Sequence, residues 1–313
     1  MNRRSFIKKI GTGGVGAAFW AGTPWPVLAD NGYKKLTILH TNDTHSRIEP
    51  FPEGIPEFAG QGGVSRRSAL INKIRKENPN NLLLDAGDVF EGTPYFKKFD
   101  GALDFEIMSH MKYDAGTIGN HEFDNGVQGF VDVADNADFP FVSANYDFGS
   151  TPMSYWVREF ITRNIDGIRC GIFGLGVDFK NLVEPHLHRG ITYKDPVEVS
   201  KDLADRLKNY FRCDFIICLS HLGYQYNSEK VSDRILASEV PGIDLIIGGH
   251  THTFLDQPEE FVHEDGQKTL VTQVGHSGLV LGHLDFFFDH NKQVVAVKSN
   301  NMSVGPADLS FTG

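Results

Sequence analysis

Seven acidic, amide and imidazole residues stand shortly after runs of apolar residues, and their types are those that bind divalent cations. They are Asp43, His45, Asp88, Asn120, His221, His250 and His252. Oxygen ligands and imidazoles suit zinc, manganese or iron, and the absence of cysteine from the set argues against a structural zinc site. Seven such ligands are enough for two cations, and paired divalent cations are used to cleave phosphate esters. The residues therefore predict a two-metal site for phosphate ester hydrolysis.

Five apolar runs precede these residues and predict the strands that position them. The runs cover residues 36–39, 82–84, 115–118, 215–219 and 243–247. Such runs are typical of strands buried on both faces, and open α/β sheets collect binding residues beyond the carboxyl ends of their strands. We therefore expect five strands to deliver the seven ligands to one edge.

The spacing of the ligands predicts how they act together. Asp43 and His45 stand two residues apart, as do His250 and His252. On an extended strand end, each of these pairs would project to one face. Asp88 stands alone after its strand and is the natural bridging ligand, because one carboxylate can hold two cations. Each motif alone also fits a turn or a core histidine, and it is their conjunction at strand ends that favours metal binding.

The rest of the chain alternates between helix and strand patterns. A helix is expected at 65–78, a second begins after the capping residue Asp195, and a third covers 230–239. Consecutive strands with antiparallel pairing are expected at 269–274, 280–288 and 294–297. Two mixed sheets stacked face to face and flanked by helices satisfy both patterns. The predicted fold is therefore α/β, a four-layer α/β/β/α sandwich.

The remaining histidines lack a strand-end partner. His40 lies within the first strand and is expected to be a core or supporting group, and Glu122 could support the site without a catalytic step. The other histidines are expected to be structural or exposed, and they are His110, His186, His188, His263, His276, His283 and His290. The loop 46–63 either rims the site or is a plain surface insertion.

The first 29 residues predict an export signal. Adjacent Arg3 and Arg4 lead into a weakly apolar, Gly-rich stretch, and small residues end at Ala29. The pattern resembles a twin-arginine signal, with an ordinary secretory signal or an uncleaved anchor as alternatives. Export would place the protein in the periplasm or outside the cell. The stretch is too short and too interrupted by glycine for a stable membrane span, and no other segment approaches that length.

Charge and length limit the partners and the domain count. Cleavage after Ala29 leaves 313 − 29 = 284 residues, and 30–313 is expected to be one catalytic domain. The net charge of −10 becomes 26 − 40 = −14, because the signal carries four basic residues and no acids. Such a charge argues against nucleic-acid polymers and anionic membranes as partners. A small phosphate ester stays possible because bound cations reverse the local sign. Three cysteines make no disulfide framework.

Four motifs in the chain form a specific combination. They are LHTNDTHSR at 39–47, DAGD at 85–88, GNHEFDNG at 119–126 and GGHTH at 248–252. Together they resemble the 5'-nucleotidase branch of the calcineurin-like metallophosphoesterases, and the resemblance extends from about residue 36 to 288. The motif at 119–126 is particular to that branch, because metallophosphoesterases at large share only its first three residues.

The resemblance implies two metal sites that share one carboxylate. Their ligands are Asp43, His45, Asp88 and His252 for one cation, and Asp88, Asn120, His221 and His250 for the other. The resemblance also implies that His121 and Asp124 form a catalytic dyad, and that Asn120 and His121 contact the substrate phosphate. Many nucleotidases carry Gln or Asn where His252 stands, which loosens the inference to nucleotide substrates.

The expected activity is hydrolysis of nucleotide-type phosphate monoesters by an exported enzyme. Water held by the two cations is expected to lose a proton and attack phosphorus in line. His121, oriented by Asp124, would stabilise or protonate the leaving oxygen. Nucleotidases of this branch carry a C-terminal domain that stacks the nucleobase, which is expected to be absent from a chain that ends at Gly313.

Several alternatives to this activity stay open. The chain could be a catalytic subunit that needs a separately encoded recognition chain, or a hydrolase of UDP-sugars or cyclic nucleotides. Thiosulfohydrolase chemistry on the same fold and a catalytically silent metal-binding subunit are two further hypotheses. No residue in the sequence selects thiosulfohydrolase chemistry, and retention of every metal ligand and of His121 and Asp124 argues against a silent subunit.

Overall fold

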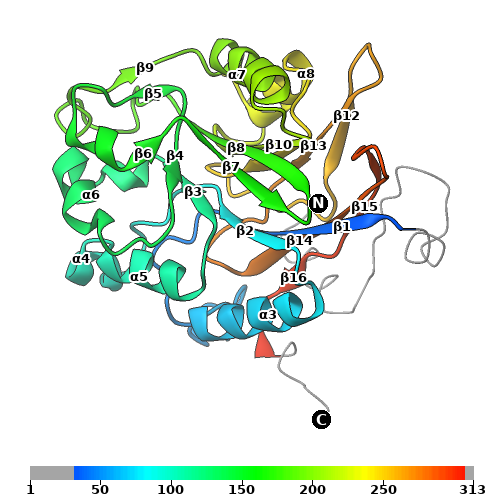
Figure 1. Ribbon diagram of the computed structural model, residues 1–313. Helices are drawn as coiled ribbons and strands as arrows, with labels where there is room; N and C mark the ends of the chain where they lie inside the picture. Colours follow the sequence, from blue (N-terminus) through cyan, green and yellow to red (C-terminus); the bar gives the residue numbers. More distant parts are fainter. Residues whose placement is uncertain (1–31, 307–313) are drawn as a thin grey trace.

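Two mixed sheets lie at the centre of the structure, a computed structural model that describes residues 32–306 (Figure 1). The first sheet has the order β15 (Val294–Ser299), β14 (Val280–Phe288), β1 (Lys34–Thr41), β2 (Asn81–Asp85), β3 (Ala115–Thr117), β4 (Phe141–Val142) and β6 (Val157–Arg158), and β16 (Met302–Ser303) pairs with β14. The second has the order β12 (Glu259–Val262), β13 (Lys268–Thr272), β11 (Leu245–Gly248), β10 (Phe215–His221), β8 (Ile168–Gly176) and β7 (Phe160–Ile165). A separate ribbon pairs β5 (Tyr146–Asp147) with β9 (Thr192–Tyr193). The expected export signal lies outside the described residues.

Parallel pairing at the centre of each sheet aligns the strand ends that precede the predicted ligands. In the first sheet β1, β2 and β3 are parallel, and Thr41 is level with Asp85. In the second sheet β10 and β11 are parallel, and Ser220 is level with Gly248. The chain therefore leaves neighbouring strands at the same height, and the residues that follow them meet at one edge of each sheet.

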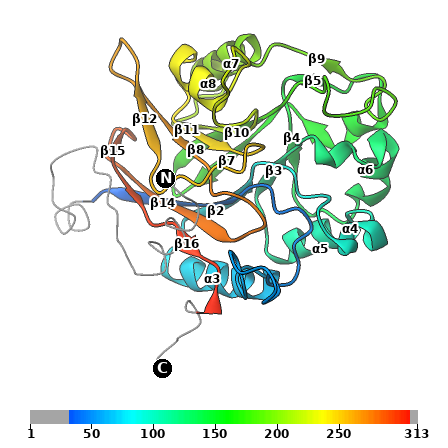
Figure 2. The same ribbon diagram turned by 180° about the vertical axis from the view of Figure 1, so that it is seen from behind.

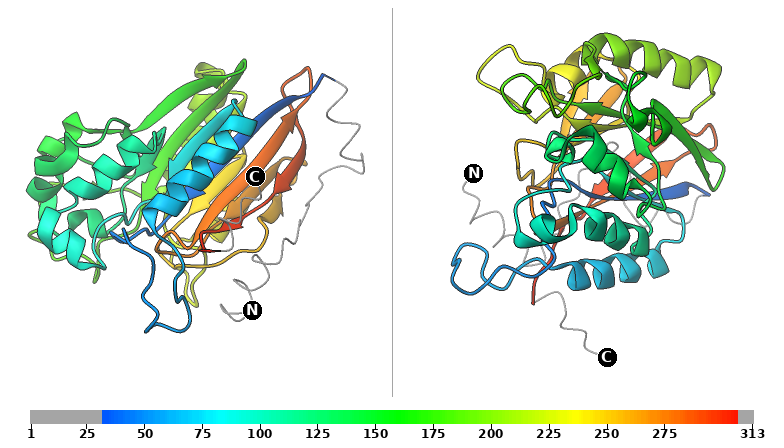
Figure 3. Two further views of the ribbon diagram at one scale, coloured as in Figure 1. Left: turned by 90° about the horizontal axis from the view of Figure 1, so that it is seen from below. Right: turned by 90° about the vertical axis from the view of Figure 1, so that its left-hand side faces the viewer.

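Helices cover the outer face of each sheet (Figures 1 and 2). On the first sheet lie α3 (Val64–Glu77), α4 (Pro94–Phe99), α5 (Ala102–His110) and α6 (Gly126–Ala134), and on the second α7 (Pro196–Asp205) and α8 (Asp233–Glu239). A core that includes Ile38, Leu84 and Ile217 fills the space between the sheets. The view from below shows α3 lying over the first sheet, roughly along the direction of its strands (Figure 3). The predicted four-layer α/β/β/α fold is confirmed.

Capping side chains set the helix starts. Asp195 accepts hydrogen bonds from the backbone N–H groups of Val197 (2.9 Å) and Glu198 (3.0 Å), and α7 begins there as predicted. The helix expected at 230–239 begins three residues later, at Asp233. The reason is that Ser232 is its N-cap, with an extended backbone that cannot continue a helix toward residue 230.

The C-terminal strands differ in one respect from the expected antiparallel series. The pair β14 and β15 is antiparallel as predicted. In contrast, β13 lies in the second sheet, parallel to β11 and antiparallel to β12. Chain order alone could not reveal this, because β12 was not among the expected strands and β13 has the apolar pattern of any buried strand.

The described residues contain neither a membrane-spanning helix nor a disulfide. No helix within residues 32–306 combines the length and apolar character needed to cross a membrane. The three cysteines, Cys170, Cys213 and Cys218, are buried there as free thiols.

Candidate dinuclear metal centre

Three predicted ligands from the first and second sheets form one cluster. Asp43, after β1, lies beside His45 and His252, and their candidate ligand atoms are within 4.8 Å of one another. The Nε2 atoms of the two histidines are 3.0 Å apart, and His252 Nε2 is 3.4 Å from Asp43 Oδ1. Three such groups converging on one point are suited to a divalent cation.

A second cluster contains Asp88, His221 and His250, again with ligand atoms within 4.8 Å. His221 Nε2 lies 2.9 Å from Asp88 Oδ2, but the two groups are not aligned as a hydrogen bond. Short separation without hydrogen-bond alignment is what two ligands of one cation show. His221 and Asp88 are both buried, so a cation here would be shielded from solvent.

The two clusters adjoin each other. Asp43 belongs to the first cluster and His250 to the second. Asp43 Oδ1 accepts a 2.9 Å hydrogen bond from the backbone N–H of His250. Asn120 is buried, and its Oδ1 atom has no hydrogen-bond partner. A buried carbonyl oxygen is normally paired, so an orphaned one beside these clusters fits a metal ligand. The side chains present therefore fit two divalent cations.

The second nitrogen of two imidazoles is held by a backbone carbonyl. His221 Nδ1 lies 2.7 Å from the carbonyl oxygen of Ala86, and His45 Nδ1 lies 3.1 Å from that of Phe90. Such contacts fix the ring orientation and leave Nε2 as the coordinating atom. The loop that follows β2 thus supplies a candidate ligand, Asp88, and also orients two others.

Five of the candidate ligands have a left-handed backbone. They are Asp43 (φ 50°), His45 (φ 49°), Asp88 (φ 54°), His250 (φ 70°) and His252 (φ 51°). The expected extended geometry is therefore wrong at both pairs, and His250 and His252 belong to different clusters. The cause is that the strands have already ended and the loops bond to each other, with Asp43 N–H donating to Gly87 O (2.9 Å). Left-handed backbone at residues other than glycine gathers at functional sites.

Glu122 ties two of the ligand-bearing loops together. Its buried carboxylate accepts hydrogen bonds from the backbone N–H groups of Asp88 (3.0 Å), Val89 (2.7 Å) and Gly119 (2.6 Å). These bonds link the loop after β2 to the loop after β3. Glu122 thus holds the backbone beneath the clusters, in keeping with the expected supporting role.

His121 and Asp124 form a hydrogen-bonded pair at the rim of the clusters. His121 Nδ1 is 2.7 Å from Asp124 Oδ2, and the His121 ring centroid is 5.3 Å from that of His45. Burial alone would lower the pKa of His121. The hydrogen bond to Asp124 and the charge of Asp88 outweigh burial and raise that pKa to about 9. His121 therefore carries a proton at neutral pH in the metal-free protein.

Charges within the second cluster are strongly coupled. Burial would lower the pKa of His221, but the adjacent Asp88 carboxylate raises it to about 10. Burial would raise the pKa of Asp88, but the charge of His221 and the contact with it lower that pKa well below its usual range. Burial, followed by the charge of His221, lowers the pKa of His250 to about 4.

Some residues at the site were not predicted from sequence. His276, expected to be structural or exposed, lies with its ring 5.0 Å from that of His252 and 5.6 Å from that of Phe58. Phe58 belongs to the loop 46–63, so this loop packs against the site. The signal for His276 was a Gly-His step shortly after β13, like the step after β11. Tyr226, with its ring 6.5 Å from that of His250, gave no comparable signal.

Comparison with known proteins agrees with this fold and site. A family profile described as Calcineurin-like phosphoesterase matches residues 36–254. The chain is 35% identical to the Trifunctional nucleotide phosphoesterase protein YfkN of Bacillus subtilis, over 89% of this chain and 20% of that protein. It is 32% identical to the human 5'-nucleotidase, over 88% of this chain and 50% of the human protein. It superposes on the 5'-nucleotidase precursor of Thermus thermophilus with a TM-score of 0.80 and 32% identity, over 88% and 55% of the two chains.

The chain therefore belongs to the calcineurin-like phosphoesterase family, whose members are metal-dependent phosphoric ester hydrolases. Within that family, these relatives and the shared fold assign it to the 5'-nucleotidase branch, where it corresponds to the N-terminal catalytic part. The chain spans about half or less of the length of these relatives.

Proposed function

We propose that this chain hydrolyses phosphate monoesters of the nucleotide type with the help of two divalent cations. The observation that carries the proposal is the pair of adjoining ligand clusters with His121 and Asp124 at their rim. Asp43, His45 and His252 would hold one cation, and Asp88, Asn120, His221 and His250 the other. The bridging role of Asp88 belongs to the same proposal.

The bound cations would supply Lewis acidity, which activates water and neutralises phosphoryl charge. The protein's own groups position the phosphate. Asn120 and His121 lie in the loop after β3, and the backbone N–H of His121 donates a 2.9 Å hydrogen bond to Asp88 Oδ1. This bond ties the backbone of the phosphate-binding segment to the metal-binding carboxylate. The substrate phosphate and the cations would therefore be held by one rigid unit.

His121 would act on the leaving group. Asp124 holds its Nδ1 nitrogen, which leaves Nε2 for the substrate. The imidazolium would donate its proton to the ester oxygen as the phosphorus–oxygen bond breaks, so that an alcohol leaves in place of an alkoxide. The carboxylate of Asp124 keeps the ring oriented and stabilises its charged form.

The proposal is tested by hydrolysis with the purified, metal-reconstituted chain. AMP, UDP-glucose, 2',3'-cyclic AMP and p-nitrophenyl phosphate are offered in parallel, and the hydrolysis products of each are separated by chromatography and quantified. Preference for AMP supports the nucleotidase assignment, and preference for UDP-glucose or the cyclic nucleotide favours those alternatives. Turnover of p-nitrophenyl phosphate without discrimination among nucleotides favours a separate recognition chain. No turnover with two cations bound contradicts the proposal.

We also propose that residues 1–29 direct export through the twin-arginine route. The support is the adjacent pair Arg3 and Arg4 ahead of a Gly-rich stretch and small residues up to Ala29. Replacement of both arginines by lysine should leave the full-length precursor in the cytoplasm, as measured by cell fractionation. Unchanged export of the double variant would contradict this route.

A further inference from the structure

The segment 249–253 carries one candidate ligand for each cation. It follows β11 directly, and it contains His250 of the second cluster and His252 of the first. Both histidines have a left-handed backbone, with φ of 70° and 51°. Residues other than glycine keep such a backbone only where their surroundings impose it. The separation of the two histidines therefore depends on the groups that hold this segment.

The side-chain amide of Gln273 joins the two ends of the segment. Gln273 Nε2 donates a 2.7 Å hydrogen bond to the carbonyl oxygen of Gly249, and Gln273 Oε1 accepts from the backbone N–H of Thr253. A carbonyl oxygen can only accept and a backbone N–H can only donate, so these partners determine which way the amide points. One planar group thus spans the stretch that contains both histidines.

The same amide also contacts the middle of the segment. Gln273 Oε1 accepts a 3.2 Å hydrogen bond from the hydroxyl of Thr251, which stands between the two histidines. That hydroxyl in turn accepts a 2.9 Å hydrogen bond from the backbone N–H of Tyr224, in the loop after β10. A Cβ atom at Gly248 would lie 3.0 Å from Gln273 Nε2, so the amide packs against the end of β11. The segment is therefore held at its start, its middle and its end.

Gln273 is itself fixed by burial and by backbone bonds. Its side chain is fully buried, and it stands directly after β13. The backbone N–H of Leu255 donates a 3.0 Å hydrogen bond to the carbonyl oxygen of Gln273, and that of Gly275 donates a 2.9 Å hydrogen bond to the carbonyl oxygen of Thr253. These two stretches run antiparallel to each other. Their pairing fixes the point from which the amide reaches the ligand segment.

The first sheet is tied to the same stretch through Asn42, the neighbour of Asp43. Asn42 Oδ1 accepts a 3.0 Å hydrogen bond from the backbone N–H of Val274. Asn42 Nδ2 donates to the carbonyl oxygen of Gly275 and to Asp43 Oδ2, each at 2.6 Å. Asp43 is a candidate ligand of the first cluster, so the residues around Gln273 contact ligand-bearing loops of both sheets.

We infer that Gln273 is a positioning residue that holds His250 and His252 at one spacing and thereby sets the separation of the two cations. This inference rests on the proposed function, because it concerns the same metal centre. Glu122 has a different place, since it holds the loops after β2 and β3. Gln273 acts through one histidine of each cluster, so loss of its amide should affect both cations together.

Replacement of Gln273 by methionine removes both hydrogen bonds and keeps a side chain of similar length. Calorimetric titration of the metal-free protein with Mn²⁺ should show the dissociation constants of both ions raised about 10–100-fold, as for loss of an outer contact to metal ligands. Thr272→Val is the matched control. Thr272 is the adjacent buried residue, and its hydroxyl has no hydrogen-bond partner among the described residues, so this substitution should leave both dissociation constants unchanged.

The electron paramagnetic resonance spectrum of the protein saturated with Mn²⁺ reports on the metal pair itself. Wild type and Thr272→Val should give the same spectrum of a spin-coupled pair, because cations in two-metal sites lie about 3.5–4 Å apart. Gln273→Met at equal occupancy should show altered coupling, because the two histidines no longer keep one spacing. A residue that only stabilised the fold would leave this spectrum unchanged.

Gln273→Asn is the second variant, and it carries the same expectations if Gln273→Met does not fold. It keeps the amide but is shorter by a methylene, so it cannot reach both Gly249 and Thr253. Wild-type affinity for both ions, loss of affinity for one ion only, or an unchanged spectrum at saturation would each overturn the inference. If wild type binds two ions and the variants respond as expected but no ester is cleaved, the proposed function fails and the positioning role stands. If wild type does not bind two ions, both fail.

Discussion

His221 and Asp88 are buried side by side, and each sets the charge of the other. The Asp88 carboxylate outweighs burial and raises the pKa of His221 to about 10, so the imidazole carries a proton at neutral pH in the metal-free protein. A histidine must be neutral to coordinate a cation. A cation that enters the second cluster therefore has to displace this proton.

Metal binding at pH 7 should therefore release about one proton per chain from His221. Apparent metal affinity should rise about tenfold per pH unit until the pH reaches the pKa of His221. Calorimetry in buffers of different ionisation enthalpy measures the release. His45 should contribute none, because burial lowers its pKa despite the nearby carboxylates of Asp88 and Asp43. Metal uptake without proton release would contradict the assignment of His221 as a ligand.

His121 and Asp124 should govern the alkaline side of the pH profile. The pKa of His121 is raised in the metal-free protein, so its proton is present there at neutral pH and is lost as the pH rises through that pKa. In Asp124→Asn the alkaline limb of kcat should move about one unit toward lower pH, because the stabilising carboxylate is gone. Bound cations lower the pKa in both proteins, so the difference between the two profiles is the readout.

His121→Asn removes the proton donor itself and serves as the companion variant. Its kcat should fall about 10²–10⁴-fold while metal content stays near two per chain. Equal loss of metal and activity would instead make His121 a structural ligand.

At the residue scale, the sequence predicted the types and positions of the candidate ligands but not their backbone. Asp43 and His45 could be selected because their chemistry and their place after an apolar run are visible in one chain. Their left-handed backbone depends on hydrogen bonds between loops, such as that from His45 N–H to Asp88 O, which form only after folding. The same applies to His276, which meets His252 only in three dimensions.

The loop after β3 approaches the loop after β2 closely. Gly119, the first residue of the GNHEFDNG motif, faces the Asp88 carboxylate, and a Cβ atom there would overlap Asp88 Oδ1 and Asp88 N. Gly119 does not have a positive φ, so glycine is needed here because there is no room for a side chain, not because of the backbone conformation. The loop after β3 can therefore approach the loop after β2 only without a side chain at residue 119.

Gly119→Ala should push Asp88 away from its cluster and lower metal affinity about 10–100-fold, as displaced supporting contacts do. Gly116→Ala, within β3, is the matched control, because its Cβ would meet neighbours at an ordinary 3.5 Å or more. Metal content after dialysis against graded free zinc measures the effect. Equal affinity in the two variants would show that the close approach does not matter.

At the element scale, apolar runs predicted the strands beneath the site because buried parallel strands are visible as such in sequence. The apolar runs did not predict which strands pair with each other. Whether β13 pairs with β14 or with β11 depends on β12, a short strand with alternate residues exposed that gave little signal. The late start of α8 depends on one capping side chain, Ser232.

At the scale of the whole molecule, the two proposed cations should stabilise the folded protein as well as serve in catalysis. Without them, Asp43 and Asp88 are buried carboxylates at the junction of both sheets, held on left-handed backbone. Ligands that bind only the folded state stabilise it by about 4 kcal/mol when present at a thousandfold excess over Kd. The fold and the site should therefore lose stability together when the metals are removed.

Chelation should lower the Tm by about 10 °C, since 1 kcal/mol corresponds to about 2–4 °C in a domain of this size. Differential scanning calorimetry with and without EDTA measures the change, and readdition of zinc or manganese should reverse it. His121→Asn should show the same metal-dependent shift as wild type. An unchanged Tm after complete metal removal would contradict this coupling.

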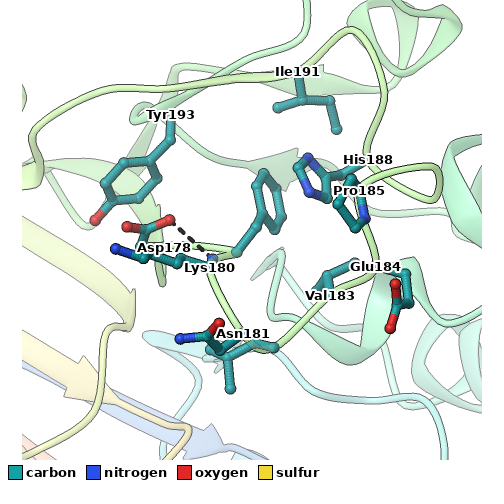
Figure 4. Close-up of a pocket in the computed structure, with 11 residues that line it drawn as sticks. Asp178, Lys180, Asn181, Val183, Glu184, Pro185, His188, Ile191 and Tyr193 are labelled. Carbon is teal, nitrogen blue, oxygen red and sulfur yellow. Dashed lines mark hydrogen bonds between the residues drawn. The ribbon is translucent and has the colours of Figure 1, made fainter.

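The four-layer architecture was predictable because alternating strand and helix patterns leave few arrangements open. The shape of the segment between β8 and β9 (Figure 4) was not, because this segment lacks periodicity and packs through Phe179 on Phe123 and Tyr146. The candidate ligands of the proposed metal site were thus visible in sequence, and the packing of this segment was not.

The central claim, hydrolysis by a two-metal site, is tested most directly by metal titration of the chelated protein with AMP as substrate. Metal is added in steps while phosphate release and bound metal per chain are measured. We expect activity to appear only as the second equivalent binds, and to reach its maximum at two cations per chain. Full activity at one equivalent, or in the metal-free protein, would contradict the account.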